Sequence, residues 1–112
     1  KSNIWKELKE AREVFKEKPF YINIPAKSIY EKAQDEILVQ GIIDLYYIDK
    51  HDNLVLLDYK TDYIENGNEQ ELINKYKNQL DLYKEALENA LKRKVDKVYI
   101  YSVYLGKEIE IK

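Results

Sequence analysis

The chain has 112 residues, with 19 basic and 21 acidic side chains and a formal net charge of −2. This length favours a single domain, and the slightly acidic balance argues against a stand-alone basic clamp for nucleic acid. The lack of cysteine excludes disulfides, thiolate zinc sites and cysteine-ligated iron–sulfur clusters, and a single histidine excludes a His-pair metal site. No apolar run approaches the ~20 residues that a membrane span needs.

The first half of the chain is predicted to form one helix and three strands. Apolar residues at helical spacing predict a helix over residues 3–17, which the following Lys-Pro pair would end. Alternating apolar residues predict a strand over Phe20–Ile24. Runs of β-branched and aromatic residues predict two further strands over Glu36–Ile48 and Leu54–Thr61, joined as a hairpin by the polar turn 49–53.

The second half is predicted to form a long amphipathic helix over residues 69–94 and two strands over 95–105 and 108–112. The resulting order α, β, β, β, α, β, β indicates an α/β (α+β) fold in which helices flank a mixed sheet. No repeat or linker interrupts the chain, so we expect residues 1–112 to form one domain. Because the sequence begins at Lys1 and contains no methionine, we expect it to be excised from a longer protein.

The predicted hairpin carries an acidic and a basic side chain on one face of an apolar strand. Side chains two residues apart share a face, so Asp58 and Lys60 point the same way. If Ile48 pairs with Leu54 across the turn, Asp44 lies directly opposite Asp58, with Cβ atoms about 4.5–5.5 Å apart. The hairpin would then bring two carboxylates and a lysine together.

Two opposed carboxylates repel each other, and burying both costs several kcal/mol unless the charges are compensated. A shared divalent cation would offset this cost, and oxygen ligands favour Mg²⁺, Mn²⁺ or Ca²⁺ over zinc. Lys60 would then orient a water molecule or stabilise developing negative charge. The alternative is that Asp58 and Lys60 pair with each other or with solvent at a sheet edge.

Gln79 and Tyr83 are spaced i, i+4 and therefore lie on one face of the long predicted helix. Spacing alone favours Tyr83 as a core residue and Gln79 as a boundary residue. On the rim of a metal cleft, the same pair would hold a nucleic-acid strand through phosphate hydrogen bonds and base stacking.

Three short motifs follow one another in the chain. They are Gly41-Ile42-Ile43-Asp44, Asp58-Tyr59-Lys60-Thr61-Asp62 and Gln79-Leu80-Asp81-Leu82-Tyr83. In this order the chain resembles the PD-(D/E)xK nuclease superfamily, and more narrowly the RecB-like nuclease domains at the C-terminal end of bacterial ATP-dependent helicase–nucleases. The resemblance covers about residues 17–105. It implies a restriction-endonuclease-like fold and metal-dependent, exonucleolytic hydrolysis of DNA phosphodiester bonds.

The resemblance also implies roles for the hairpin residues. Asp44 and Asp58 correspond to the family's metal ligands, and Lys60 corresponds to its catalytic lysine. The backbone carbonyl of Tyr59 would be a further metal ligand. Asp62 directly follows the lysine motif and would support the site from behind the residues that bind metal.

Residues outside the hairpin complete the implied site. The family's first motif has an acidic residue on a helix, and Glu17, in the context Glu-Lys-Pro-Phe, matches it; Glu13, one turn earlier, is the alternative. Gln79 and Tyr83 correspond to the helix motif that contacts DNA. His51 lies in the polar turn, where we expect it to be exposed to solvent.

The implied cofactor is Mg²⁺, for which Mn²⁺ would substitute, without an iron–sulfur cluster. The implied setting is a bacterial cytoplasmic protein that has a helicase motor upstream and whose partner is a second nuclease subunit. It would act on single-stranded DNA in double-strand-break repair and recombination. Two alternatives stay open. One is an inactive nuclease-fold domain that serves as a binding or scaffold module, and the other is a stand-alone nuclease of the same fold.

Overall fold

The computed structural model describes residues 3–25 and 36–111. The order of helices and strands is the predicted one. In chain order the elements are α1 (Asn3–Glu10), β1 (Glu13–Pro25), β2 (Glu36–Ile48), β3 (Leu54–Lys60), the short 3-10 helix η2 (Glu65–Gly67), α2 (Glu69–Leu91), β4 (Lys97–Ser102) and β5 (Lys107–Ile111). Within the described ranges, no helix has the length and apolar character needed to cross a membrane.

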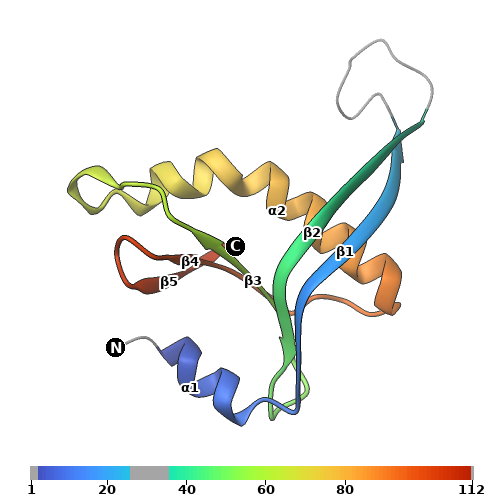
Figure 1. The fold of residues 1–112 in the computed structure, drawn as a ribbon, viewed down its shortest axis with the longest axis horizontal. Coiled ribbons are helices and arrows are strands. Elements are labelled where there is room, and N and C mark those ends of the chain that lie inside the picture. Colours follow the sequence, from blue (N-terminus) through green and yellow to red (C-terminus); the bar gives the residue numbers. More distant parts are fainter. Residues whose placement is uncertain (1–2, 26–35, 112) are drawn as a thin grey trace.

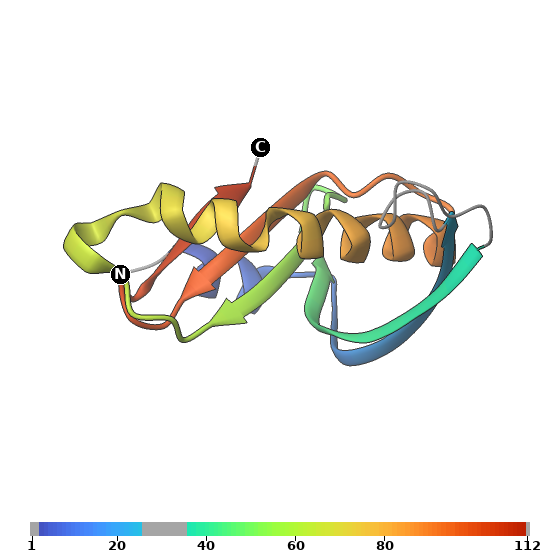
Figure 2. The ribbon, with the colours of Figure 1, turned by 90° about the horizontal axis from the view of Figure 1, so that it is seen from above.

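The strands form one mixed sheet in the order β1-β2-β3-β4-β5. Among the strands that the structure describes, β3 and β4 run parallel, and the other neighbouring pairs are antiparallel. A parallel pair needs a long crossover, and α2 supplies it. Figures 1 and 2 show α2 crossing one face of the sheet, while Figure 1 shows α1 on the other side. The predicted α/β class, with a mixed sheet flanked by helices, is confirmed.

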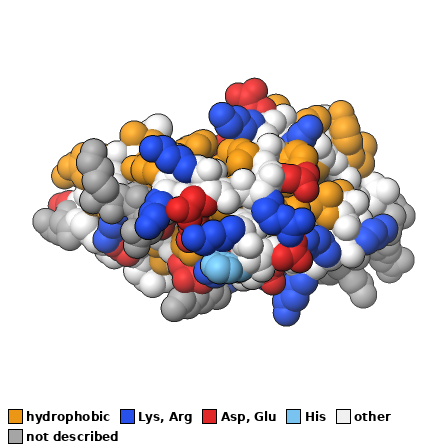
Figure 3. Space-filling model, turned by 90° about the horizontal axis from the view of Figure 1, so that it is seen from below, with side chains coloured by type: hydrophobic (Ala, Val, Ile, Leu, Met, Phe, Trp, Pro, Cys, Tyr) orange, Lys and Arg blue, Asp and Glu red, His pale blue; other side chains and the backbone are white. Residues whose placement is uncertain are grey.

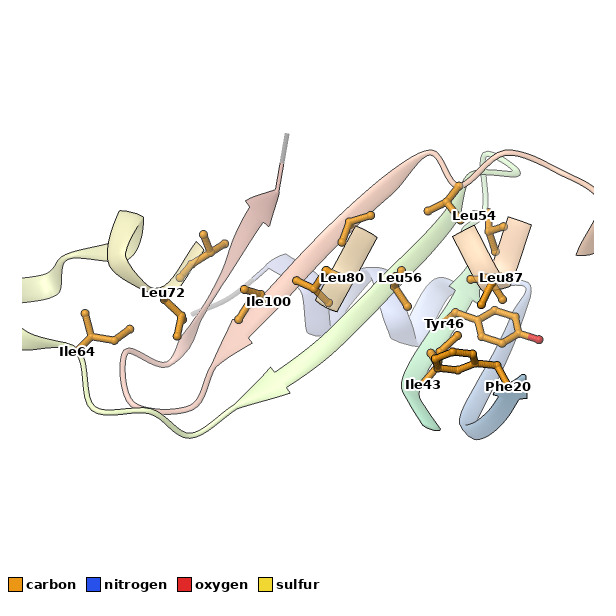
Figure 4. Packing of buried hydrophobic residues seen from close by; sticks show 14 residues of the cluster. Phe20, Ile43, Tyr46, Leu54, Leu56, Ile64, Leu72, Leu80, Leu87 and Ile100 are labelled. Atoms are coloured by element: carbon orange, nitrogen blue, oxygen red, sulfur yellow. The ribbon is translucent and has the colours of Figure 1, made fainter. Parts of the chain in front are cut away.

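The side chains of β3 alternate between two separate hydrophobic cores, one on each face of the sheet. Leu54 and Leu56 belong to the core beneath α2, whereas Val55 and Leu57 belong to the core beneath α1. Figure 4 shows Leu54 and Leu56 in the same packed layer as Leu80 and Leu87 of α2. The even-numbered positions that follow, Asp58 and Lys60, therefore face α2.

The predicted helix over residues 3–17 is wrong beyond Glu10, and the segment that follows is the first part of β1. The Arg12 N–H donates to the Ile48 carbonyl at 2.8 Å and starts the pairing with β2. The Phe15 ring stacks on Tyr46, with centroids 4.7 Å apart. Pairing and packing with β2 thus outweigh the modest helix propensity of this segment.

The bounds of two other predicted elements also need correction. The long helix ends at Leu91 instead of residue 94, because Lys92 adopts the left-handed conformation, with φ 57°, and its N–H donates to the Glu88 carbonyl. The strand predicted over residues 95–105 is confined to β4, Lys97–Ser102.

The β1–β2 ladder has one irregular position. The register pairs Lys16 with Leu45 and Lys18 with Ile43, and it skips Glu17 and Asp44, which lie between these pairs. Glu17 has φ 52°, a left-handed conformation that is costly for a residue with a Cβ atom. The ribbon therefore bends where Asp44 leaves the regular ladder.

The two faces of the β1–β2 ribbon exchange at this bend. Phe15 and Phe20 are five residues apart, and a regular strand would place them on opposite faces. Both nevertheless pack in the core beneath α2. The outer part of the ribbon thus turns toward α2, where the Phe20 ring meets Tyr83 edge-on at a centroid distance of 5.1 Å.

Gly41 leaves room for this aromatic contact. A Cβ atom at position 41 would lie 3.0 Å from two ring atoms of Phe20. We therefore expect Gly41→Val to lower the free energy of unfolding by about 1–3 kcal/mol through overpacking, as measured by urea denaturation. Gln40→Val, at an exposed neighbouring position, is the control and should change it by less than about 0.5 kcal/mol. Equal stability of the two variants would contradict the tight contact.

Candidate functional site

The hairpin register brings Asp44 and Asp58 to the same end of the β2–β3 ladder. Ile48 pairs with Leu54, as predicted, and the ladder continues to the pair Leu45 and Leu57. Asp44 and Asp58 come next on their strands, where the ladder has ended and the strands begin to separate. They are therefore neighbours without being a regular pair, which leaves their carboxylates free to meet beneath α2.

A hydrogen bond from the neighbouring strand holds the Asp44 carboxylate. The backbone N–H of Tyr59 donates to Asp44 Oδ2 at 3.0 Å. The β2–β3 ladder has ended at this point, so the Tyr59 N–H has no backbone partner on β2, and the Asp44 carboxylate takes that place. The Tyr59 side chain points to the other face of the sheet and approaches Trp5 of α1. Tyr59 thus contributes its backbone to the site.

The Asp58 carboxylate is buried, with 3% of the residue exposed. Burial raises the pKa of Asp58 to about 6; Lys60 opposes this shift and Asp44 adds to it. Lys60 Nζ lies 2.8 Å from Asp58 Oδ2. Even so, no described residue donates a well-aligned hydrogen bond to that oxygen. Asp58 is therefore a buried, incompletely satisfied acid next to a second carboxylate.

The Lys60 ammonium connects the hairpin to α2. It donates to Gln79 Oε1 at 2.9 Å and lies 4.1 Å from the centroid of the Tyr76 ring. The alternative drawn from the sequence, in which Asp58 and Lys60 pair with each other, is thus present in the structure. The pair is not at a solvated edge, because Asp44 and α2 enclose it.

The donor set fits a hard divalent cation. Asp44 and Asp58 supply carboxylate oxygens, one of which is buried without a hydrogen bond, and such oxygens suit Mg²⁺ or a similar ion. A cation would also offset the repulsion between the two acids. Within the described ranges, no three Asp, Glu, His or Cys side chains are grouped as a metal site. Two carboxylates are therefore the side-chain ligands that the fold brings together.

The two candidates for the first motif lie apart from this pair. Glu17 and Glu13 are both exposed and both belong to β1. They were expected on a helix, and the correction follows from the end of α1 at Glu10. The bend at Glu17 is next to Asp44 in the ribbon, yet the Glu17 carboxylate is not grouped with Asp44 and Asp58. A ligand role for either glutamate stays a prediction.

Gln79 and Tyr83 occupy different positions relative to the site. Gln79 accepts a hydrogen bond from Lys60, and Lys60 in turn lies beside the Asp58 carboxylate. Tyr83 is half-buried and packs against Phe20, so it joins α2 to the outer part of the β1–β2 ribbon. Burial raises the pKa of the Tyr83 phenol, and the Asp58 charge adds to this effect.

The sequence analysis did not identify Tyr76 as a site residue. The Tyr76 hydroxyl lies 3.0 Å from both carboxylate oxygens of Asp62, and the ring faces Lys60. Lys75 binds the same Asp62 carboxylate at 2.7 Å. The available signal was the i, i+3 spacing of Tyr76 and Gln79, which places both on the helix face that meets Lys60.

The opposite face of the molecule has a different character. Basic and acidic side chains alternate there around the single histidine (Figure 3). A hollow of about 360 Å³ on that side is lined by residues of α1 and of the turn after β2, including Glu10, Asp49 and the exposed His51. Asp44, Asp58 and Lys60 do not line this hollow, so it is separate from the candidate site.

The chain belongs to the PD-(D/E)XK nuclease superfamily, whose family model matches residues 2–111. It is 43% identical over 118 residues to an ATP-dependent helicase/nuclease subunit of Clostridium novyi, covering 100% of this chain and 10% of that protein. It is 44% identical over 110 residues to the corresponding protein of Clostridium perfringens strain ATCC 13124, covering 92% of this chain and 8% of that protein. For the Thermoanaerobacter sp. strain X514 protein of the same name, the identity is 38% over 115 residues, covering 98% and 9%.

These matches confirm the family resemblance that the three motifs predicted. The chain spans about a tenth or less of the length of these relatives. Members of this superfamily generally use divalent metal ions, which agrees with the oxygen-only donor set of the candidate site.

A second buried aspartate allows a direct test of the incompletely compensated charge at Asp58. Asp49 is 5% exposed and accepts hydrogen bonds from the backbone N–H groups of His51 and Asn53 and from the Asn53 side chain. Burial opposes ionisation, but these hydrogen bonds outweigh it and lower the pKa of Asp49. The two aspartates are thus buried to a similar degree, but the Asp49 carboxylate accepts several hydrogen bonds, whereas Asp58 Oδ2 accepts none from the described residues.

We expect Asp58→Asn to raise the free energy of unfolding by about 1–2 kcal/mol at neutral pH without divalent metal, because it removes a poorly compensated buried charge. Asp49→Asn should instead lower it by about 1–3 kcal/mol, because its amide cannot accept all the hydrogen bonds that the carboxylate accepts. Urea denaturation in a chelating buffer measures both values. Destabilisation of equal size in the two variants would contradict this account of Asp58.

Proposed function

We propose that this chain is a metal-dependent nuclease domain that hydrolyses DNA phosphodiester bonds, acting as an exonuclease. The observation that carries the proposal is the convergence of Asp44, Asp58 and Lys60 beneath Gln79, in a chain of the PD-(D/E)XK nuclease superfamily. Burial holds Asp58 in place and the hydrogen bond from the Tyr59 N–H holds Asp44, which favours precise placement of a reacting phosphate.

In this proposal Asp44, Asp58 and the Tyr59 carbonyl hold Mg²⁺, for which Mn²⁺ substitutes. The bound metal would supply an activated water molecule and neutralise charge on the phosphate. Lys60, held by Gln79, presents its ammonium toward the same space and stabilises negative charge that develops there. The Tyr59 N–H keeps the Asp44 carboxylate oriented while this happens.

Further residues extend the proposed site toward the substrate. Glu17 serves as the first-motif acidic ligand, with Glu13 as the alternative. Gln79 and Tyr83 contact the DNA strand, and the position of Gln79 beside Lys60 supports this assignment. Asp62 supports the lysine from behind, in agreement with its hydrogen bond to Tyr76.

We further propose that residues 1–112 are one nuclease domain at the C-terminal end of an AddA-type helicase–nuclease. The names of the relatives and the small share of their length that is matched support this proposal. In this setting a superfamily 1 helicase motor lies upstream, and the partner is of the AddB type. The complex acts in the bacterial cytoplasm in double-strand-break repair and recombination, and this domain carries no iron–sulfur cluster.

Single-stranded DNA is the substrate that we propose. The formal charge of −2 supports delivery of the strand by other parts of the protein, because a domain that gripped the backbone alone would need a basic surface.

The test is cleavage of labelled single- and double-stranded DNA by the intact gene product, with Mg²⁺, with Mn²⁺ and with a chelator. We expect metal-dependent cleavage that Asp58→Ala and Lys60→Ala each reduce by at least about a hundredfold, since each removes a charge that acts on the reacting phosphate. Asp52→Ala, at an exposed aspartate of the turn, is the control and should cleave like the wild type.

The outcomes separate the proposed function from its main alternative. Metal binding without cleavage, lost in Asp58→Ala, would place a metal site on the hairpin of a non-cleaving domain. Neither cleavage nor metal binding by a folded wild type would overturn the nuclease proposal and favour a scaffold module.

The first-motif assignment has its own test. If Glu17 is a metal ligand, Glu17→Gln should raise the Mg²⁺ concentration needed for half-maximal cleavage by about tenfold or more. Glu13→Gln is the matched control, because both glutamates are exposed and lie on β1. The reverse result would assign the role to Glu13, and unchanged metal dependence in both variants would exclude both residues.

A further inference from the structure

The Lys60 ammonium is enclosed by three different partners. It lies 2.8 Å from Asp58 Oδ2, donates to Gln79 Oε1 at 2.9 Å and lies over the Tyr76 ring, 4.1 Å from its centroid. An ammonium has three protons, so two can point to oxygen atoms and the third toward the ring. Only 16% of the side chain is exposed. The ring therefore replaces water on the remaining side of the charge.

The Tyr76 ring is itself fixed by a second set of contacts. Its hydroxyl lies at hydrogen-bond distance from both oxygens of Asp62, each at 3.0 Å. Asp62 also binds Lys75 at 2.7 Å, so its carboxylate is held by a lysine of α2, the helix that carries Tyr76. Asp62 follows the end of β3 by two residues. The ring is thus part of α2 and is also hydrogen-bonded to the segment that follows β3.

We propose that Tyr76 is a positioning residue for Lys60, holding the ammonium on the face of its ring while Asp62 fixes the ring. A lysine side chain has four rotatable bonds, and a single ion pair restrains it poorly. A cation over an aromatic face is attracted by the ring electrons, and the attraction grows when water is excluded. The ring thereby keeps the charge in place when the Asp58 carboxylate is engaged elsewhere.

This inference rests on the proposed function, because Lys60 acts on a phosphate only in a nuclease. It adds that the cleavage step depends on Tyr76, a residue outside the three motifs. It also gives Asp62 a definite task, since Asp62 would act on Lys60 through the Tyr76 hydroxyl.

The first experiment measures how reactive the Lys60 amine is in the metal-free protein. Reductive methylation of the intact gene product, followed residue by residue with mass spectrometry, gives the rate for Lys60. We expect Tyr76→Leu to raise this rate by about threefold or more, because the ring no longer covers the amine. Tyr76→Phe keeps the ring but loses the hydroxyl that Asp62 holds, so its Lys60 rate should lie between those of the wild type and Tyr76→Leu.

Tyr63→Leu is the matched control, because Tyr63 is an exposed tyrosine nearby in the chain whose ring contacts Tyr104. It should leave the Lys60 rate unchanged. An equal Lys60 rate in the wild type and in Tyr76→Leu would overturn the inference.

The second experiment separates ring electrons from ring size. Phenylalanine carrying one, two or three ring fluorines is introduced at position 76 by codon suppression, and single-turnover cleavage is measured at saturating metal. We expect the rate to fall stepwise with each fluorine, to a total of about tenfold, while DNA affinity stays constant. A structural role alone predicts no trend, because the ring changes little in size.

The two experiments fail in distinguishable ways. If the wild type does not cleave, the proposed function fails, while the labelling rates still test the contact between Tyr76 and Lys60. If the wild type cleaves, Lys60→Ala does not, and Tyr76→Leu cleaves at the wild-type rate, the function stands and the positioning role fails. A flat rate across the fluorine series, in variants that fold and bind DNA, would also overturn the positioning role.

Discussion

The burial of β3 on both faces is the constraint on which the rest of the structure depends. This strand pairs with β2 on one side and with β4 on the other, and its side chains alternate between two cores. A strand packed on four sides cannot rotate or slide, so the alternation that begins in apolar residues continues unchanged into Asp58 and Lys60. The same packing that stabilises the sheet thus orients a buried acid and a lysine toward α2.

The sequence was sufficient to predict those elements whose structure depends on residues close together in the chain. The bounds of β2 and the starts of β3 and α2 follow from alternation, composition and helical spacing. The register of the hairpin follows from the length of its turn as far as the pair Leu45 and Leu57, and Asp44 and Asp58 come next, just beyond the end of the ladder. The β1 segment fails for the opposite reason. Its spacing suits a helix, and only contacts with β2, more distant along the chain, make it a strand.

The candidate site was predictable in part for the same reason. Asp44, Asp58 and Lys60 lie on one hairpin, so arithmetic on the turn was enough to group them. Tyr76 approaches Lys60 only because α2 returns across the sheet, and the helical spacing of Tyr76 and Gln79 does not by itself distinguish this ring from a core side chain. The conformation of Glu17 was equally hidden, since a glutamate gives no signal for a left-handed backbone.

The contact of Phe20 with Gly41 and Tyr83 joins two of the sequence motifs into one packing unit. Gly41 begins the motif that ends at Asp44, and Tyr83 ends the motif that begins at Gln79, yet both touch the same ring. The sizes of the side chains at positions 20, 41 and 83 therefore constrain one another, although these positions are far apart in the chain. A larger residue at position 41 requires a smaller ring at 20 or 83, so these three positions should covary among related sequences for reasons of space, separately from the chemistry of the carboxylates.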